Sequence, residues 1–116
     1  MTWVTLGEIV GARSGDKGGN ANVGFWARCA QAYCWMVQYL TPDRLRELYP
    51  EAASLRVERF ELANIWSLNF VIHGLLGEGV SASLRPDPQA KTLCEELRAR
   101  RVYVPRSVLA AGTTRS

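Results

Sequence analysis

Residues 66–73 alternate more regularly between apolar and polar side chains than any other segment of the chain. Trp66, Leu68, Phe70 and Ile72 fall on one face, and Ser67, Asn69, Val71 and His73 fall on the other. Because successive side chains of a strand point to opposite faces, this pattern predicts a strand with one face in the core. The second face is largely polar and is therefore available for function.

Four further strands are predicted from weaker patterns. Residues 4–12 form a first strand whose apolar face is interrupted by Glu8, residues 21–27 alternate, and residues 102–104 form a short closing strand. Residues 55–62 change phase: the apolar residues before Arg59 share one face, whereas those after it share the other, in the pairs Leu55 and Val57 and then Phe60 and Leu62. We therefore expect a β-bulge or bend near Arg59.

Three helices are predicted between these strands. Residues 29–40 are apolar on nearly every side, which suits a helix packed against the sheet and against a second surface, such as another subunit. Thr41 is suited to cap a short helix that begins at Pro42 and ends before Pro50. Asp87 and Pro88 begin a third helix, whose apolar positions have the spacing of one helix face: Ala90, Leu93, Cys94 and Leu97.

Apart from the first strand and the short helix that begins at Pro42, the predicted elements follow the order strand, helix, strand, strand, helix, strand. This is the order of the ferredoxin-like split βαβ arrangement. We therefore predict an α+β fold, a mostly antiparallel sheet with helices on one face and an extra N-terminal strand. Residues 1–105 form a single domain, and residues 106–116 form a flexible tail. The pattern leaves open whether the N-terminal or the closing strand borders residues 21–27.

The glycine-rich segment 13–20 concentrates the candidate chemistry. As the long loop of a hairpin, it would let successive N–H groups turn toward one anion, while Arg13 and Lys17 supply positive charge. It is not a phosphate-binding P-loop, because Asp16 precedes Lys17 and Gly18 follows it. A solvated hairpin tip explains the composition equally well, but the donors of Arg13, Asn20 and Asn22 at the same end of the sheet favour binding.

The predicted ligand-binding residues follow from this segment and from the polar strand faces. They are Arg13, Ser14, Gly15, Asp16, Lys17, Gly18, Asn20 and Asn22, with Asn69, His73 and Arg85 as secondary candidates. We assign no catalytic residue and no cofactor. No metal site is predicted, because His73 is the only histidine and the spacing of Cys29 and Cys34 does not place their thiols on one helix face.

Composition narrows the classes of function. The 116 residues carry a net charge of only +3, and basic residues alternate with acidic ones, so nucleic acid is not an expected partner. No apolar run is long enough to span a membrane. Three cysteines without a disulfide framework, and no signal peptide at the N-terminus, favour a cytoplasmic protein.

Specific motifs resemble the C-terminal domain of the acyclic terpene utilisation (AtuA-like) family, a ferredoxin-like domain. Those motifs are residues 12–18 with Asn22 and Gly24, residues 69–70 and 73–74, residues 79–80 and 83–85, and Asp87, Gln89 and Lys91. Ala90 and Pro86 depart from the family pattern. The resemblance implies a stand-alone version of the domain that pairs with a separate large AtuA-like chain. It also implies a place near the catabolism of branched or terpenoid acids as coenzyme A thioesters.

Three hypotheses of function follow. The first is a cytoplasmic, homo-oligomeric accessory domain that catalyses nothing itself and binds a small anionic molecule, such as the phosphate or carboxylate of an acyl-CoA-type ligand. The second is a structural interaction module with the helix at 29–40 as its interface. The third, and least favoured, is an enzyme that acts on a coenzyme A thioester through His73 and Asp16.

Overall fold

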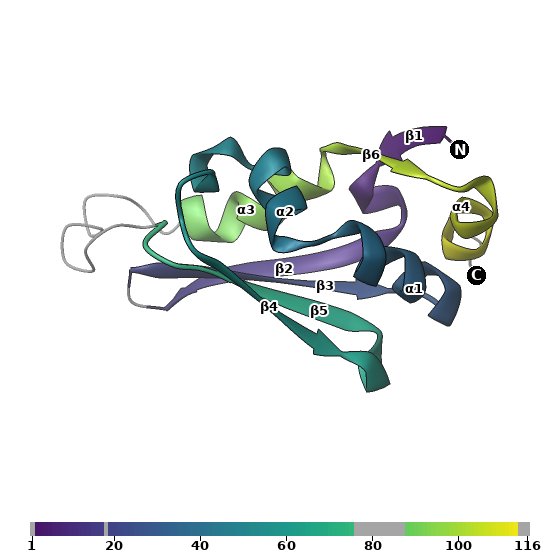
Figure 1. Cartoon of the computed structure of the whole chain (residues 1–116), viewed down its shortest axis with the longest axis horizontal. Helices are drawn as coiled ribbons and strands as arrows, with labels where there is room; N and C mark the ends of the chain where they lie inside the picture. Colours follow the sequence, from purple (N-terminus) through teal and green to yellow (C-terminus); the bar gives the residue numbers. More distant parts are fainter. Residues whose placement is uncertain (1, 18, 76–87, 114–116) are drawn as a thin grey trace.

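The computed structural model describes residues 2–17, 19–75 and 88–113. The main sheet has four antiparallel strands in the order β2 (Val10–Lys17), β3 (Asn20–Ala27), β5 (Ser67–Ile72) and β4 (Val57–Leu62). Helices α1 (Ala30–Tyr39), α2 (Pro42–Leu48) and α3 (Pro88–Arg98) lie on one side of this sheet (Figure 1). The predicted α+β, ferredoxin-like architecture with helices on one face is confirmed.

A second, two-stranded sheet pairs β1 (Thr2–Thr5) with β6 (Arg101–Val104). The predicted first strand, 4–12, was therefore wrong in its extent, because a short 3-10 helix, η1 (Leu6–Glu8), separates β1 from β2. The break falls at Glu8, whose carboxylate accepts hydrogen bonds from the backbone N–H and the hydroxyl of Thr5 at 3.2 and 3.1 Å. Leu6 is fully buried at the turn, so the chain changes direction while it keeps an apolar contact.

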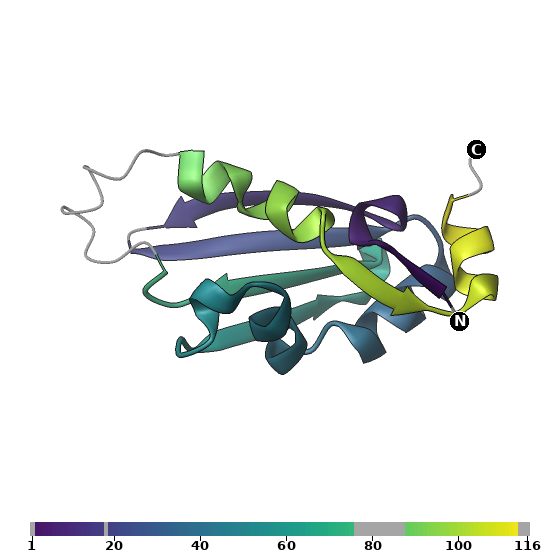
Figure 2. The same cartoon turned by 90° about the horizontal axis from the view of Figure 1, so that it is seen from above.

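The strand that borders β3 is β2, which resolves the question left open by the sequence. The two strands pair residue by residue from Val10 with Ala27 to Lys17 with Asn20. Only Gly18 and Gly19 lie between them in the sequence, so closing this hairpin costs little chain entropy. β6 joins β1 instead, and that pair lies on the same side of the main sheet as the helices (Figure 1), over one end of the strands (Figure 2).

Two predicted loops are regular structure. The expectation of a long loop at 13–20 was wrong, because β2 continues through Arg13 to Lys17. The expectation of a flexible tail was also wrong for residues 106–113, which form α4 (Arg106–Thr113). Val108 is buried and Leu109 packs against the core, so the start of this helix is held by apolar contact beside α1.

The predicted bulge near Arg59 is absent from the described ladder. β4 pairs with β5 without interruption from Val57 with Ile72 to Leu62 with Ser67. Arg59 therefore points to the helix side, where its guanidinium donates to the carbonyl oxygens of Val37 and Leu40 at 2.7 and 3.1 Å. The unbroken strand leaves Phe60 and Leu62 on the opposite face, 47% and 41% exposed.

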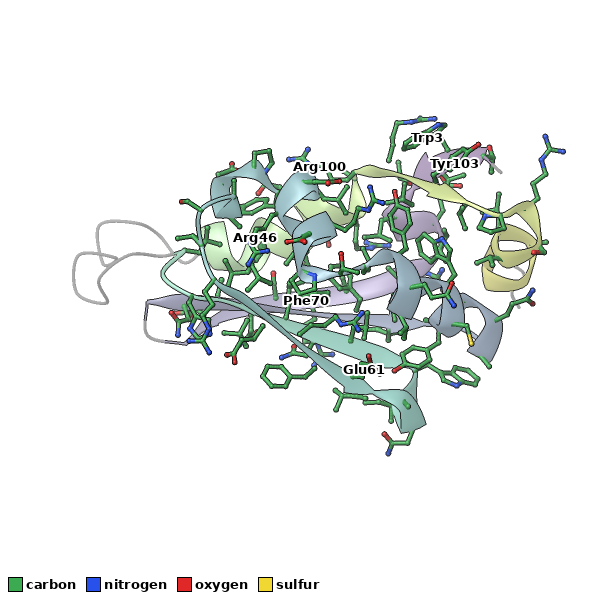
Figure 3. The ribbon with its side chains drawn as sticks, in the orientation of Figure 1. Trp3, Arg46, Glu61, Phe70, Arg100 and Tyr103 are labelled. Carbon is green, nitrogen blue, oxygen red and sulfur yellow. The ribbon has the colours of Figure 1, made fainter. Side chains whose placement is uncertain are left out.

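The core lies between the sheet and the helices. Phe25 and Phe70 meet edge to face in neighbouring strands, with ring centroids 5.9 Å apart, and both are fully buried (Figure 3 labels Phe70). On α1, Met36 and Trp35 are also buried, and Trp35 stacks on Tyr39 with centroids 5.0 Å apart. The outward side of α1 is small or polar, with Ala30, Gln31, Cys34 and Gln38 exposed. Most of the apolar surface predicted for this helix is therefore used within the chain.

Candidate functional site

The face of the main sheet that the described helices leave uncovered is built around Gly24. The strand register places Arg13 of β2 on one side of Gly24 and Asn69 of β5 on the other. Asn22 and Trp26 precede and follow Gly24 by two residues on β3, so they share its face. Four side chains thus surround a position that has no side chain.

A hollow of about 320 Å³ lies over this position. Its lining combines polar and apolar residues: Arg13, Asn22, Gly24, Phe25, Trp26, Leu62, Ile65, Ser67, Leu68 and Asn69. The register separates the two kinds, because Arg13 and Asn69 lie level with Gly24 whereas Leu62 lies level with Trp26, nearer the β4–β5 turn. Ile65 belongs to that turn, in the 3-10 helix η3 (Ala63–Ile65). The hollow therefore has a polar end and an apolar end.

The position of Trp26 depends on Gly11. The two residues are register partners, and the indole ring of Trp26 lies directly over Gly11, in the space that a β-carbon there would occupy. Because glycine has no side chain, the ring can lean across the neighbouring strand and form one wall of the hollow. Trp26 stays 41% exposed in that position.

Three of the predicted site residues are brought together here, and several others are not. Arg13, Asn22 and Asn69 line the hollow. Ser14 lies on the helix side, where its hydroxyl accepts a hydrogen bond from the backbone N–H of Cys94 at 3.0 Å and holds α3 against β2. Asn20 is used in a second link within the chain, because its side-chain oxygen accepts from the N–H of Gly74 at 2.8 Å.

Gly15 and Asp16, two further candidates of the glycine-rich segment, are not among the lining residues of the hollow. Gly15 and Asp16 are paired strand residues, so the segment is not a loop whose successive N–H groups converge on one anion. Asp16 pairs with the buried Ala21 and therefore points to the helix side. Gly18, Arg85 and the side chain of Lys17 lie outside the described residues.

His73 forms a separate pair with Glu58 near the other end of the uncovered face. Its Nε2 lies 2.7 Å from a carboxylate oxygen of Glu58, which also pairs with Arg56 at 3.0 Å. The hydrogen bond from His73 holds the pKa of Glu58 below its ordinary value of 4.5, and the charge of Arg56 adds to this effect. Asp16 points to the opposite side of the sheet, so the pairing of His73 with Asp16 that an enzymatic role would need is not formed.

We predict that Glu58 contributes to the loss of folding stability at acid pH. Because its folded-state pKa is lowered, its contribution to stability is present above its unfolded pKa and is lost as the pH falls through the folded value. Urea unfolding of wild type at pH values from about 6 to about 3 should therefore show a loss of stability at the acid end that is smaller in Glu58→Gln. Glu51→Gln, at an exposed position of the 3-10 helix η2 (Pro50–Ala52), controls for net charge. Identical acid profiles for wild type and Glu58→Gln would contradict the prediction.

No helix in the described part of the chain is long and apolar enough to cross a membrane. Among residues 2–17, 19–75 and 88–113, no group of three or more histidine, cysteine, aspartate or glutamate side chains is placed to hold a metal ion.

The family model described as the AtuA ferredoxin-like domain matches residues 4–103. The chain belongs to this family. The match begins within β1 and ends within β6, so the whole main sheet and the hollow of the AtuA ferredoxin-like domain fall inside it. The resemblance seen in the sequence motifs is thereby confirmed. No curated protein and no solved structure shows a significant match to the chain.

Sequence reasoning missed the apolar half of the site in this AtuA ferredoxin-like domain. Trp26, Leu62, Ile65 and Ser67 line the hollow but were not among the predicted site residues. A signal was present, because Trp26 is a large apolar residue on the polar face of its strand. The phase change at 55–62 was a second signal, which an unbroken strand with an apolar outer face explains better than a bulge does.

Proposed function

We propose that this AtuA ferredoxin-like domain is a non-catalytic, accessory binding domain whose hollow takes a small organic anion with an apolar body. The observation that carries this proposal is the convergence of Arg13, Asn22 and Asn69 around the bare backbone of Gly24, next to Trp26 and Leu62. Family context, in which branched or terpenoid acids are handled as coenzyme A thioesters, supports an acid or acyl-CoA-type ligand.

The chemistry of the lining suits a carboxylate or a thioester carbonyl. The guanidinium of Arg13 presents paired N–H donors that match a carboxylate or phosphate, and no described residue forms an ion pair with it. The amides of Asn22 and Asn69 offer both donors and acceptors. At the other end, Trp26 and Leu62 provide an apolar surface for a hydrocarbon chain. A volume of about 320 Å³ is at the lower end of the range for small-molecule sites, which favours a short acyl group.

We predict that Arg13→Ala weakens binding of a short branched carboxylate by about 10- to 150-fold, because a hydrogen bond to a charged group contributes about 1.5–3 kcal/mol. The measurement is isothermal titration calorimetry with 3-methylbutanoate, its coenzyme A thioester, and inorganic phosphate as separate ligands. Arg106→Ala removes the same charge from an exposed position on α4 and should leave binding unchanged.

The three ligands distinguish a site for an organic anion from a site for any small anion. Heat with the carboxylate or the thioester that is reduced in Arg13→Ala supports the organic-anion site. Heat with phosphate alone would show a simple anion site and contradict the role of the apolar end. Absence of heat with all three, or equal affinities in Arg13→Ala and wild type, would overturn the proposal.

A further inference from the structure

The uncovered face of the main sheet exposes large apolar side chains beyond those that line the hollow. Five large apolar side chains lie on this face or in the adjoining β4–β5 turn and are between 40% and 59% exposed: Trp26, Phe60, Leu62, Ile65 and Trp66. Phe60 is 47% exposed and does not line the hollow. Monomeric proteins rarely leave large contiguous apolar patches in water, so this face calls for a protein partner.

The side chains on this face form rows across the four strands. The central row consists of Arg13, Gly24, Asn69 and Phe60, in the order of the strands β2, β3, β5 and β4. The next row toward the β4–β5 turn consists of Gly11, Trp26, Ser67 and Leu62, and the row on the other side consists of Gly15, Asn22, Val71 and Glu58. Each row contains a glycine as well as larger side chains, so a large side chain of a second copy can lie over a glycine of the first.

We propose that the uncovered face binds the same face of a second copy of this chain, related by a two-fold axis that runs parallel to the strands between β3 and β5. This inference adds to the proposed function and rests on it only where the hollow is concerned. Such an axis places each strand of one copy over its opposite number in the other, β2 over β4 and β3 over β5. Every contact then occurs twice, as in other symmetric dimers.

The central row supports this pairing through charge and shape. The guanidinium of Arg13 lies over the ring of Phe60 in the second copy, an arrangement in which a cation is attracted to an aromatic face. Asn69 of the second copy lies over Gly24, where there is no side chain to obstruct it. Each copy thus contributes its Asn69 to the roof of the other copy's hollow, which is open above in a single chain.

The neighbouring rows are complementary in the same sense. Ser67 of the second copy lies over the backbone of Trp26, where the lean of the indole ring toward Gly11 leaves room for it. Leu62 of the second copy lies over Gly11, where it meets the indole ring that covers that glycine. In the third row, Glu58 of the second copy lies over Gly15, one row from the Arg13 cation. Packed sheets twist by about 30° relative to each other, so these matches are closest in the central row.

The size of the face predicts a weak dimer. Eight residues of β3 span about 25 Å and four strands span about 19 Å, which gives about 480 Å² of projected face on each copy. Stable specific interfaces bury about 800 Å² on each partner, so this interface is smaller than those and falls in the size class of weak, transient interfaces. We therefore expect a dissociation constant in the micromolar range.

Sedimentation velocity of the full chain without ligand, from about 5 to about 500 µM, tests the proposal. Wild type should shift from monomer to dimer over this range. Phe60→Lys places a second cation opposite Arg13 and should weaken the dimer at least about tenfold, whereas Arg13→Glu combined with Phe60→Lys should restore it. Trp3→Lys, at a 54% exposed position on β1, should dimerise like wild type. Circular dichroism checks that each variant is folded.

The outcomes separate this inference from the proposed function. A wild-type chain that stays monomeric at the highest concentration, or a Phe60→Lys variant that dimerises as wild type does, would overturn the dimer. So would a double variant that is no better than Phe60→Lys alone. A monomer that binds ligand through Arg13 would leave the proposed function intact. A dimer whose ligand binding is insensitive to Arg13 would leave the dimer intact and remove the proposed function.

Discussion

Replacement of Phe70 by alanine is expected to lower the free energy of unfolding by about 3–5 kcal/mol, which is the usual cost of removing a buried phenylalanine. Phe70 is fully buried on β5, at the centre of the main sheet, and meets Phe25 edge to face. Its removal takes away apolar burial and leaves a cavity between the sheet and the helices. Urea unfolding followed by circular dichroism measures the loss. For a domain of 116 residues this is a large fraction of the total stability.

Phe60→Ala is the matched control for this prediction. Phe60 lies on the neighbouring strand β4, but its ring is 47% exposed on the uncovered face. Its removal should change the unfolding free energy by less than about 1 kcal/mol at a protein concentration where the chain is monomeric. Equal losses for the two variants would mean that Phe60 also packs in the core, and would contradict the unbroken register of β4.

Gly24→Val is expected to abolish binding of the carboxylate ligand without destabilising the fold. A β-carbon at Gly24 would lie 3.4 Å from the side-chain oxygen of Asn69 and 3.9 Å from the carbonyl oxygen of Leu68, which are tolerable contacts. The added methyl groups would project into the hollow and fill the space between the side chains of Arg13 and Asn69. We expect affinity to fall at least about 100-fold, a loss of about 2.7 kcal/mol. Stability should stay level or rise, because a glycine inside a strand costs about 0.5–1 kcal/mol relative to alanine.

Gly15→Val makes the same substitution one strand away. Gly15 lies on the same face of the sheet but does not line the hollow, and a β-carbon there would come no closer than 4.0 Å to Asn22. Calorimetry should show ligand binding close to wild type in this variant. If Gly15→Val destroys binding and Gly24→Val does not, the ligand sits at the hairpin end of β2 and the hollow is not the site.

The sequence was most informative where one face of an element is buried and the other is not. The alternation at 66–73 predicted β5 and its inward residues Leu68, Phe70 and Ile72, all of which are fully buried. Thr41 and Pro42 predicted the start of α2, and the hydroxyl of Thr41 accepts from the N–H of Arg44 at 3.1 Å. These predictions succeeded because local geometry and the burial of apolar side chains acted in the same direction.

The sequence was misleading where an apolar residue faces outward. Assuming that Phe60 and Leu62 must reach the core led to a bulge that the ladder does not contain. The same assumption gave α1 a free apolar surface that Trp35 and Met36 in fact bury within the chain. Period-two patterns report which residues share a face, but they do not report whether that face is covered.

The glycine-rich segment shows a second limit. Composition predicted the long loop of a hairpin at 13–20, because glycine and polar residues favour turns. Most of this segment instead forms a strand, because it pairs with β3. The pairing depends on residues 20–27, which lie outside most of the segment, and not on the composition of the segment alone. Arg13 was predicted as a binding residue because it belongs to this segment, but the structure places it in the hollow for a different reason. It lies in the hollow because of its register with Gly24, and not because it belongs to a loop.

The guanidinium of Arg59 gives the domain a mechanical property of its own. It joins the outermost strand to the last carbonyl groups of α1 and to Glu61 at once, at 2.7, 3.1 and 2.8 Å. The edge strand β4 and the end of α1 can therefore separate only if both bonds to the carbonyl groups break, which couples the opening of the two elements. Glu61 lies on β4 itself and holds the guanidinium in place. The same anchor keeps a charged side chain along the rim of the sheet, which discourages further strands from adding there and the growth of fibrils from this rim.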